Sequence, residues 1–174
     1  TVARFNFQKD HENLFKALEL LRKKNVEFYC ILVGHGMDKT NIKLVSLIKK
    51  YQLTDSVKLL GLRDDIPNIM SEIDMHVLSS SSEGFPNVVA EAMACGTPCI
   101  VTDVGEAAFI VGNTGWVVPS KKPELLSHSI NDAILELGTN KWKLRINQAK
   151  SRIKENFNIN NIVKSYRKVW NEIR

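Results

Sequence analysis

The sequence predicts an α/β protein built on a parallel β-sheet of about six strands with helices on both faces. Two observations support this prediction. Short apolar runs alternate with segments of helical periodicity over residues 1–119, which is the pattern of a parallel sheet covered by helices. The 174 residues also suit one domain and are enough to bury a sizeable core. We therefore expect a single domain over residues 1–174.

Six short apolar segments are expected to be strands: 1–5, 27–33, 57–60, 75–78, 98–101 and 115–118. The expected helices are 12–24, 40–51, 66–71, 87–95, 106–111, 124–137, 141–156 and 160–174. In the first helix, apolar residues from Leu14 to Leu21 recur at helical spacing, and Asp10 is a candidate N-cap. Ligands of such sheets bind beyond the carboxyl ends of the strands. The loops that follow the first four strands are therefore the expected site.

The composition is that of an ordinary globular protein, with 44% hydrophobic and 25% charged residues. No apolar run approaches the length of a membrane span, and no secretory signal is visible. The net charge of +5 suggests anionic partners without choosing among phosphate, lipid head groups and nucleic acid. Cys30, Cys95 and Cys99 lack the spacing of zinc ligands. Cys95 and Cys99 are expected to be buried small apolar residues, and a reducing, cytosolic setting fits best.

The most informative segment is 82–98, which holds two acids eight positions apart. Glu83 follows a strand and a run of serines, and Glu91 lies inside an otherwise apolar helix whose first turn accommodates Pro86. An apolar helix of this kind is expected to be buried on most sides, so its carboxylate must be paired, neutral or bound to a ligand. The free N–H groups at the start of the helix form a ready site for an anion. A phosphate cradle beside two carboxylates is the chemistry that a nucleotide sugar requires.

These residues resemble the donor-binding half of a retaining glycosyltransferase of family 4, the large "group 1" family, whose enzymes have two Rossmann-like domains (the GT-B fold). The family signature is a pair of glutamates separated by seven residues, here Glu83 and Glu91, followed by a segment like residues 91–98. Further matches follow in the family's order over most of the chain: 4–9, 33–36, 57–61 and 114–119. Two departures, Asp10 and Phe109, stand where a glycine and a glutamate are common, and they concern donor detail.

The resemblance implies a role for each matched residue. Glu83 would contact the hydroxyls of the donor sugar, and Glu91 would bind both ribose hydroxyls. Two cations and two backbone amides would hold the diphosphate: Arg4, Lys9, Asn87 and Val88. The loop beside the donor sugar would be Gly84, Phe85 and Pro86. The residues near the nucleobase would be Gly34, Gly61, Leu62 and Arg63.

From the residues alone, each of these sites has a simpler alternative. Arg4 and Lys9 also fit a solvated surface pair, because such residues are usually exposed. Glu83 fits a loop carboxylate in water, and Glu91 fits a helix glutamate paired with a lysine or arginine. Gly34 would serve equally well in a plain turn.

Other polar residues are expected to be structural. His35 and His76 are not expected to be catalytic, and His76 lies in a strand where a satisfied core histidine is expected. Asp64 is a candidate helix cap, and Gly105 a candidate tight turn. The serines at 79–82 either touch phosphate or only end a strand.

The resemblance implies transfer of a sugar, with retention of configuration, from a nucleoside diphosphate to an acceptor hydroxyl in cell-envelope polysaccharide or glycolipid synthesis. The acceptor would bind to an N-terminal domain that this chain lacks, so the chain alone is expected to be inactive. The last helices would pack toward that domain. The expected location is cytoplasmic, including the inner face of the cell membrane. We expect no metal, no cofactor and no nucleic-acid partner.

Two other function classes remain open at this point. A sugar-nucleotide epimerase shares the two-domain fold but fits the paired glutamates less well, and a non-catalytic nucleotide-binding module is also compatible. An NAD-type protein would need a glycine-rich turn after the first strand, whereas residues 5–9 contain no glycine. The basic stretch 141–154 fits either a contact with an anionic membrane or a solvated helix face.

Overall fold

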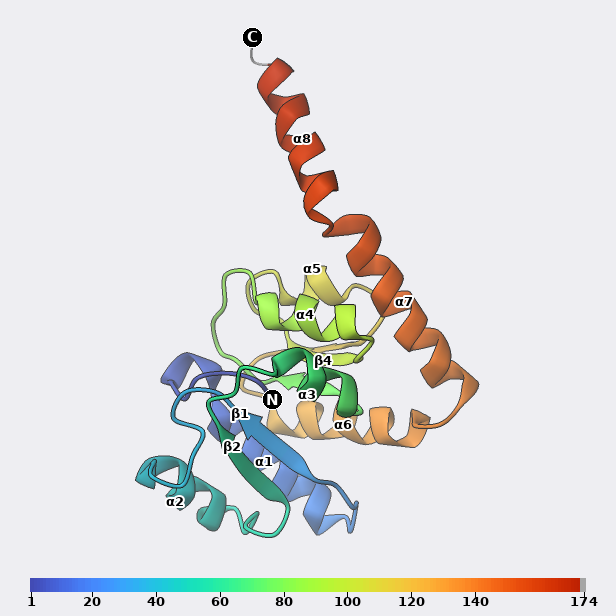
Figure 1. Ribbon diagram of the computed structural model, residues 1–174. Coiled ribbons are helices and arrows are strands. Elements are labelled where there is room, and N and C mark those ends of the chain that lie inside the picture. The colour runs from blue at the N-terminus through green and yellow to red at the C-terminus, as the bar shows by residue number, and fades with distance from the viewer. Residues whose placement is uncertain (173–174) are drawn as a thin grey trace.

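The computed structural model describes residues 1–172, without the side chains of Ile162 and Ser165 (Figure 1). Its strands form two parallel sheets, one of order β1-β2 and one of order β3-β4-β5. The strands are β1 (Cys30–Val33), β2 (Val57–Gly61), β3 (His76–Leu78), β4 (Cys99–Thr102) and β5 (Trp116–Val118). The structure therefore has the predicted α/β class, with five named strands in place of about six.

The N-terminal segment lies between the two sheets. Val2 forms an isolated parallel bridge with Val33 of β1. On its other side the contacts run through side chains. The Thr1 hydroxyl donates to the Val77 carbonyl at 2.9 Å, and the Val2 N–H donates to Nε2 of His76 at 3.4 Å. The prediction of a full strand over 1–5 is therefore wrong, because the segment forms a single bridge to β1 and contacts β3 through the Thr1 and His76 side chains instead of a backbone ladder.

The helices agree with the sequence-based bounds to within two residues wherever the structure describes both ends. They are α1 (His11–Lys23), α2 (Ile42–Lys50), α3 (Ile66–Glu72), α4 (Asn87–Cys95), α5 (Ala107–Val111), α6 (Pro123–Glu136), α7 (Asn140–Asn156) and α8 (Ile159–Glu172). A short 3₁₀ turn, η1 (Phe7–Lys9), precedes α1. The predicted cap of α1 is confirmed, since the Asp10 carboxylate accepts from the Asn13 N–H at 3.2 Å.

Helices cover both faces of the strand layer, as predicted (Figure 1). One core lies between the strands and the helices α1 and α6, and the other lies beneath α4 and α5. Alternate strand residues serve the two cores: Val77 and Ile100 belong to the first, and Leu78 and Val101 to the second. This period of two is what a strand layer buried on both faces requires.

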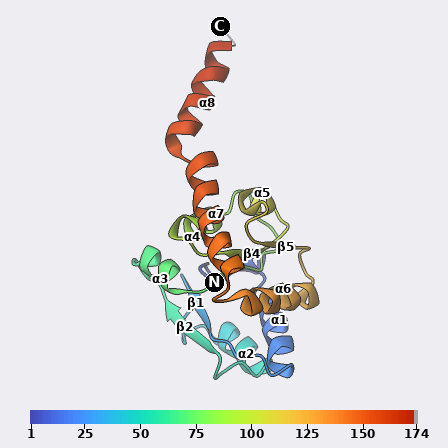
Figure 2. The same ribbon diagram turned by 90° about the vertical axis from the view of Figure 1, so that its right-hand side faces the viewer.

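The last two helices leave the body of the domain. α7 packs along α4, and α8 stands out from the rest of the molecule in both views (Figures 1 and 2). Apolar side chains on α8 recur at helical spacing and are exposed: Ile159, Val163, Tyr166 and Trp170. No helix in the described part of the chain is long and apolar enough to cross a membrane.

One buried histidine on α1 makes stability depend on pH. His11 is 3% exposed, its ring lies 5.3 Å from the Phe5 ring, and neither ring nitrogen has a hydrogen-bond partner within residues 1–172. Burial, and then the neighbouring N-terminal amino group and Lys9, lower the pKa of His11 to about 4. The folded chain thus holds this ring neutral, while the unfolded chain takes up a proton below about pH 6.5.

We expect His11 to destabilise the fold progressively as the pH falls from about 6.5 to about 4. Denaturant unfolding of the wild type and His11→Phe at pH 7.5 and 4.5 checks this. The variant should gain roughly 2 kcal/mol relative to the wild type between the two conditions. Parallel pH profiles for the wild type and His11→Phe would contradict the prediction.

Candidate functional site

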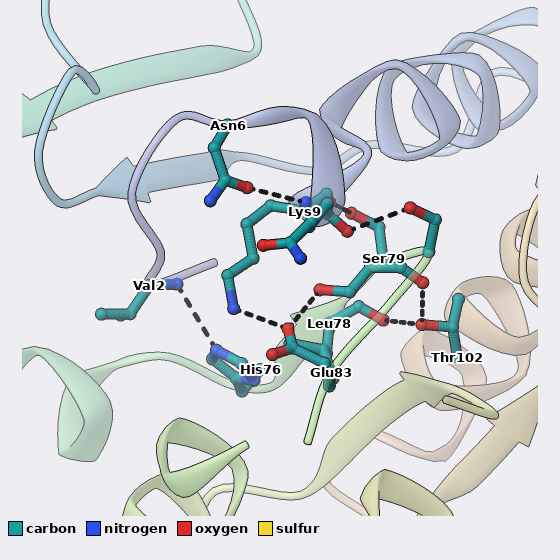
Figure 3. A network of polar contacts seen from close by, with 11 residues as sticks. Val2, Asn6, Lys9, His76, Leu78, Ser79, Glu83 and Thr102 are labelled. Atoms are coloured by element: carbon teal, nitrogen blue, oxygen red, sulfur yellow. Dashed lines mark hydrogen bonds and ion pairs between the residues drawn. The ribbon is translucent and has the colours of Figure 1, made fainter. Parts of the chain in front are cut away.

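Two loops at the carboxyl ends of the strands are joined by hydrogen bonds (Figure 3). One is η1, which follows the N-terminal segment, and the other begins at Ser79 after β3. The Ser79 hydroxyl donates to the Lys9 carbonyl at 2.9 Å, and the Ser81 N–H donates to the Gln8 carbonyl at 2.7 Å. The serine tract therefore joins two loops that lie about 70 residues apart in the sequence, and strand termination alone does not explain it.

Lys9 and Glu83, both predicted site residues, meet between these loops. Lys9 Nζ lies 2.6 Å from Glu83 Oε1, and the Ser80 hydroxyl donates to the same oxygen at 2.6 Å. The two charged side chains are only 18% and 11% exposed. The alternatives of a solvated lysine and a solvated loop carboxylate are therefore wrong for this pair.

The backbone around Glu83 is held from the other side by the loop that follows β4. The Glu106 N–H donates to the Gly84 carbonyl at 2.8 Å. Gly105 has a φ of +52°, and a Cβ atom there would collide with the carbonyl oxygens of Glu83 and Gly84. From the sequence we assigned Gly105 only to a tight turn, because its approach to a loop 20 residues away leaves no local signal.

The start of α4 opens toward this site. Pro86 is the buried N-cap residue, and no side chain caps the helix. The N–H groups of Asn87 and Val88 make no hydrogen bond within the described chain, so they remain available to an anion. Phe85 is 47% exposed beside them, and its ring lies 5.9 Å from that of Phe157 at the end of α7.

Glu91 lies on an exposed face of α4. The residues at helical spacing from Asn87 through Glu91 to Ala94 are exposed, while Val89 and Met93 are buried. α4 packs against α3, α5, α7, β3 and β4, so it is covered on most sides as predicted. Glu91 itself lies on the exposed stripe with the small apolar Ala94, so burial does not force its carboxylate to be paired or neutral. The paired-glutamate alternative is also not observed, since Glu91 makes no ion pair within residues 1–172.

Arg4 and the glycine loops lie beside one another. Arg4 is exposed and has no partner in the described residues, and the N–H groups before and after it donate to the Val33 and His35 carbonyls. A Cβ atom at Gly34, whose φ is +135°, would collide with the Ala3 carbonyl. Gly34 is thus required by close backbone packing, which supports the plain-turn interpretation of this glycine.

The loop after β2 meets the Gly34 turn through Gly61, whose carbonyl accepts from the Gly34 N–H at 2.8 Å. Leu62 is 76% exposed. Arg63 is held by Asp65 at 2.8 and 2.7 Å, and Asp65, not Asp64, precedes α3. The prediction of Asp64 as a helix cap is therefore wrong.

His76 is fully buried in β3. Its Nε2 accepts from the Val2 N–H, but its Nδ1 has no partner among the described residues, and burial lowers its pKa well below the usual value. The histidine belongs to the core as predicted, but its hydrogen bonding is only half satisfied. His35 is exposed, and its carbonyl accepts from Phe5.

The basic stretch of α7 is partly engaged in packing. Arg145 pairs with Glu136 at 3.1 Å and lies over the Trp116 ring at 3.9 Å, and Arg152 donates to the Ile110 carbonyl at 2.8 Å. Lys143 is exposed, which fits both a solvated face and a contact with an anionic membrane. Within the described residues, no group of three or more His, Cys, Asp or Glu side chains could hold a metal ion.

Residues 1–152 match the model of the family described as glycosyl transferases group 1. The chain belongs to this family. One relative is the N,N'-diacetylbacillosaminyl-diphospho-undecaprenol α-1,3-N-acetylgalactosaminyltransferase of Campylobacter jejuni, which is 31% identical over 99% of this chain and 44% of its own length. Another is the N-acetyl-α-D-glucosaminyl L-malate synthase of Bacillus anthracis, 36% identical over 53% of this chain and 24% of its own.

Solved structures agree with the family assignment. A glycosyltransferase from Rickettsia africae superposes with a TM-score of 0.87 at 26% identity, over 98% of this chain and 46% of its own. The Anabaena protein Alr3699/HepE in complex with UDP gives 0.84 at 25% identity, over 98% of this chain and 47% of its own. The group 1 chain thus spans less than half the length of these relatives and corresponds to the C-terminal half of a GT-B structure.

Gly105→Ala should displace the loop that carries Glu83. The added Cβ atom would collide with backbone atoms, which cannot swing away as a side chain can. Gly138→Ala is the matched control, since Gly138 also has a positive φ but an added Cβ atom would meet nothing within 4 Å. We expect the control to cost about 1–2 kcal/mol of unfolding free energy from backbone strain alone, and Gly105→Ala to cost more, as denaturant unfolding would show. Equal losses would mean that Gly105 does not hold the loop.

Proposed function

We propose that this chain binds the nucleoside-diphosphate sugar of a retaining glycosyltransferase, and that a further N-terminal domain binds the acceptor. The observation that carries the proposal is the meeting of Lys9 and Glu83, 74 residues apart, beside the open start of α4. A cation, a carboxylate and free backbone amides in one place match the diphosphate and the hydroxyls of such a donor. Membership of the group 1 family supports the same reaction.

The diphosphate is assigned to Arg4, Lys9 and the amides of Asn87 and Val88. Arg4 offers an unengaged guanidinium, and the amides lie at the positive end of a helix of nine residues. When the bond to the sugar breaks, negative charge accumulates on the departing diphosphate. The amides of Asn87 and Val88 are fixed by the helix and would stabilise this charge without reorganising, whereas Lys9 would first have to leave Glu83.

The carboxylates are assigned to hydroxyls. Glu83 would accept from a hydroxyl of the donor sugar, which Gly84, Phe85 and Pro86 would border. Glu91 has a free, exposed carboxylate on the same side of α4 as Asn87, and it would accept from the ribose hydroxyls. Gly34 and Gly61, and the exposed Leu62 and Arg63 beyond them, would then border the nucleobase.

The names of relatives suggest a role in the cell envelope. The Campylobacter relative is named for transfer to a diphospho-undecaprenol carrier, and the Anabaena relative has been solved with UDP-glucose. We infer a cell-envelope polysaccharide or glycolipid as the product, made in the cytoplasm at the inner face of the membrane. The three cysteines are free thiols, which agrees with a reducing compartment.

Glu91→Ala should weaken binding of the nucleoside diphosphate far more than Asp64→Ala. Both residues are exposed acids, so the two variants change the net charge equally. Losing a hydrogen bond to a charged acceptor costs about 1.5–3 kcal/mol, which corresponds to roughly 10- to 150-fold in affinity. Titration calorimetry with the best binder among UDP, GDP and ADP measures the difference. Equal losses from the two variants would remove Glu91 from the site.

The chain alone should bind donor nucleotide weakly in excess EDTA and should transfer no sugar. The assigned diphosphate contacts come from protein groups, whereas positioning of an acceptor and exclusion of water need a second domain. Calorimetry with and without EDTA tests the first statement, and product analysis with a panel of nucleotide sugars tests the second. Loss of binding in EDTA would overturn the metal-free cradle, and robust transfer by this chain would overturn the need for another domain.

A further inference from the structure

The ion pair between Lys9 and Glu83 joins two residues that the proposed function assigns to different parts of one ligand. Lys9 is assigned to the diphosphate and Glu83 to the sugar. In the structure, however, each satisfies the charge of the other at 2.6 Å. Both side chains are largely shielded from water, so removing one partner leaves a poorly solvated charge behind. A ligand that binds the Lys9 ammonium must therefore also donate a hydrogen bond to the Glu83 carboxylate.

The two partners differ in how firmly they are held. Glu83 accepts a hydrogen bond from Ser80, which is 1% exposed and whose carbonyl accepts from the Thr102 hydroxyl at 2.7 Å. The backbone after Glu83 is held by Glu106 and by the close approach of Gly105. The carboxylate is thus fixed from three sides, and it stays where it is when its cation leaves.

Lys9 is fixed only through its backbone. Its N–H donates to the Asn6 side chain at 3.1 Å, and its carbonyl accepts from Ser79 at 2.9 Å. In the described residues its ammonium has no partner other than Glu83. A lysine side chain has four flexible methylene groups, so Lys9 is the partner that moves.

We propose that the Lys9–Glu83 pair makes the site bind an intact nucleotide sugar in preference to the bare nucleoside diphosphate. This inference rests on the proposed function. A bare diphosphate takes the Lys9 ammonium and leaves the Glu83 carboxylate without a partner. An intact donor takes the ammonium with its phosphates and supplies a sugar hydroxyl that donates to Glu83. The bare diphosphate is also the product of transfer, so the re-forming ion pair helps to expel it.

The test is a double-mutant cycle on this chain with isosteric substitutions. Dissociation constants are measured by calorimetry for the wild type, Glu83→Gln, Lys9→Met and the double variant. The ligand is the tightest binder among UDP, GDP and ADP. Glu83→Gln should bind the bare diphosphate about three- to tenfold more tightly than the wild type, because Lys9 is released from its partner. In the Lys9→Met background the same change should have no effect beyond twofold.

The second arm compares the bare diphosphate with sugar nucleotides of the same base, using glucose, galactose and their N-acetylated amino sugars. The wild type should prefer at least one of these sugar nucleotides over the diphosphate, and Glu83→Gln should lose that preference. Asp103→Asn is the control, an exposed acid at the end of β4 that makes no ion pair within residues 1–172, and it should behave as the wild type.

The outcomes separate this inference from the proposed function. If the wild type binds diphosphate but Glu83→Gln binds it no more tightly, the exchange of partners is wrong. If Glu83→Gln tightens binding equally with and without Lys9, simple repulsion between two anions explains the effect, and the ion pair has no part in selection. A wild-type chain that prefers the bare diphosphate to every sugar nucleotide would also overturn the inference. A wild type that binds none of the three diphosphates would overturn the proposed function itself.

Discussion

The placement of residues 1–3 between β1 and β3 is the contact on which the rest of the structure depends. These residues bond to Val33 on one side and to Val77 and His76 on the other. They therefore bring the two sheets together as neighbours in one layer. The loops that leave this layer at its carboxyl edge come from four different segments. They meet only because residues 1–3 fix the distance between the two sheets.

Close backbone contacts then fix those loops relative to one another. At Gly34 and Gly105 the approach is so near that any side chain would collide with a carbonyl group of another loop. The resulting positions are set by backbone atoms, which are stiffer than side chains. Polar side chains complete the arrangement, and Ser79 and Ser80 bond to the loop of Lys9 and to Glu83. The Glu83 carboxylate and its loop are consequently held in place without a ligand, whereas the Lys9 ammonium is held only by its contact with Glu83.

The sequence was sufficient to predict the helices and most of the strands, because each of these elements has its own hydrophobic periodicity. The bounds of α4 were predicted to the residue, and the Asp10 cap was found from its position alone. The features that were missed depend on partners far away in the chain. A small apolar residue such as Ala94 tolerates both core and surface, so the exposure of Glu91 could not be predicted from the sequence.

The same limit applies to the site. Motif spacing predicted the candidate residues, but the pairing of Lys9 with Glu83 spans 74 positions and has no local pattern. His76 was placed in the core correctly, yet its unpartnered Nδ1 depends on the packing around it. Motif spacing thus pointed to Lys9 and Glu83, which meet in the structure, whereas the hydrogen bonds around them follow only from three-dimensional neighbours.

Phe157 sets a limit on how short this domain can be made. Its ring lies 5.9 Å from Phe85 beside the start of α4 and 5.7 Å from Phe109 on α5. The family match ends at residue 152, five positions earlier, so a fragment trimmed to that boundary would keep every strand and every proposed ligand contact. It would nevertheless lose the ring that shields Phe85. The smallest piece that preserves the Phe85 loop in its native surroundings therefore extends past the end of the family match to Phe157.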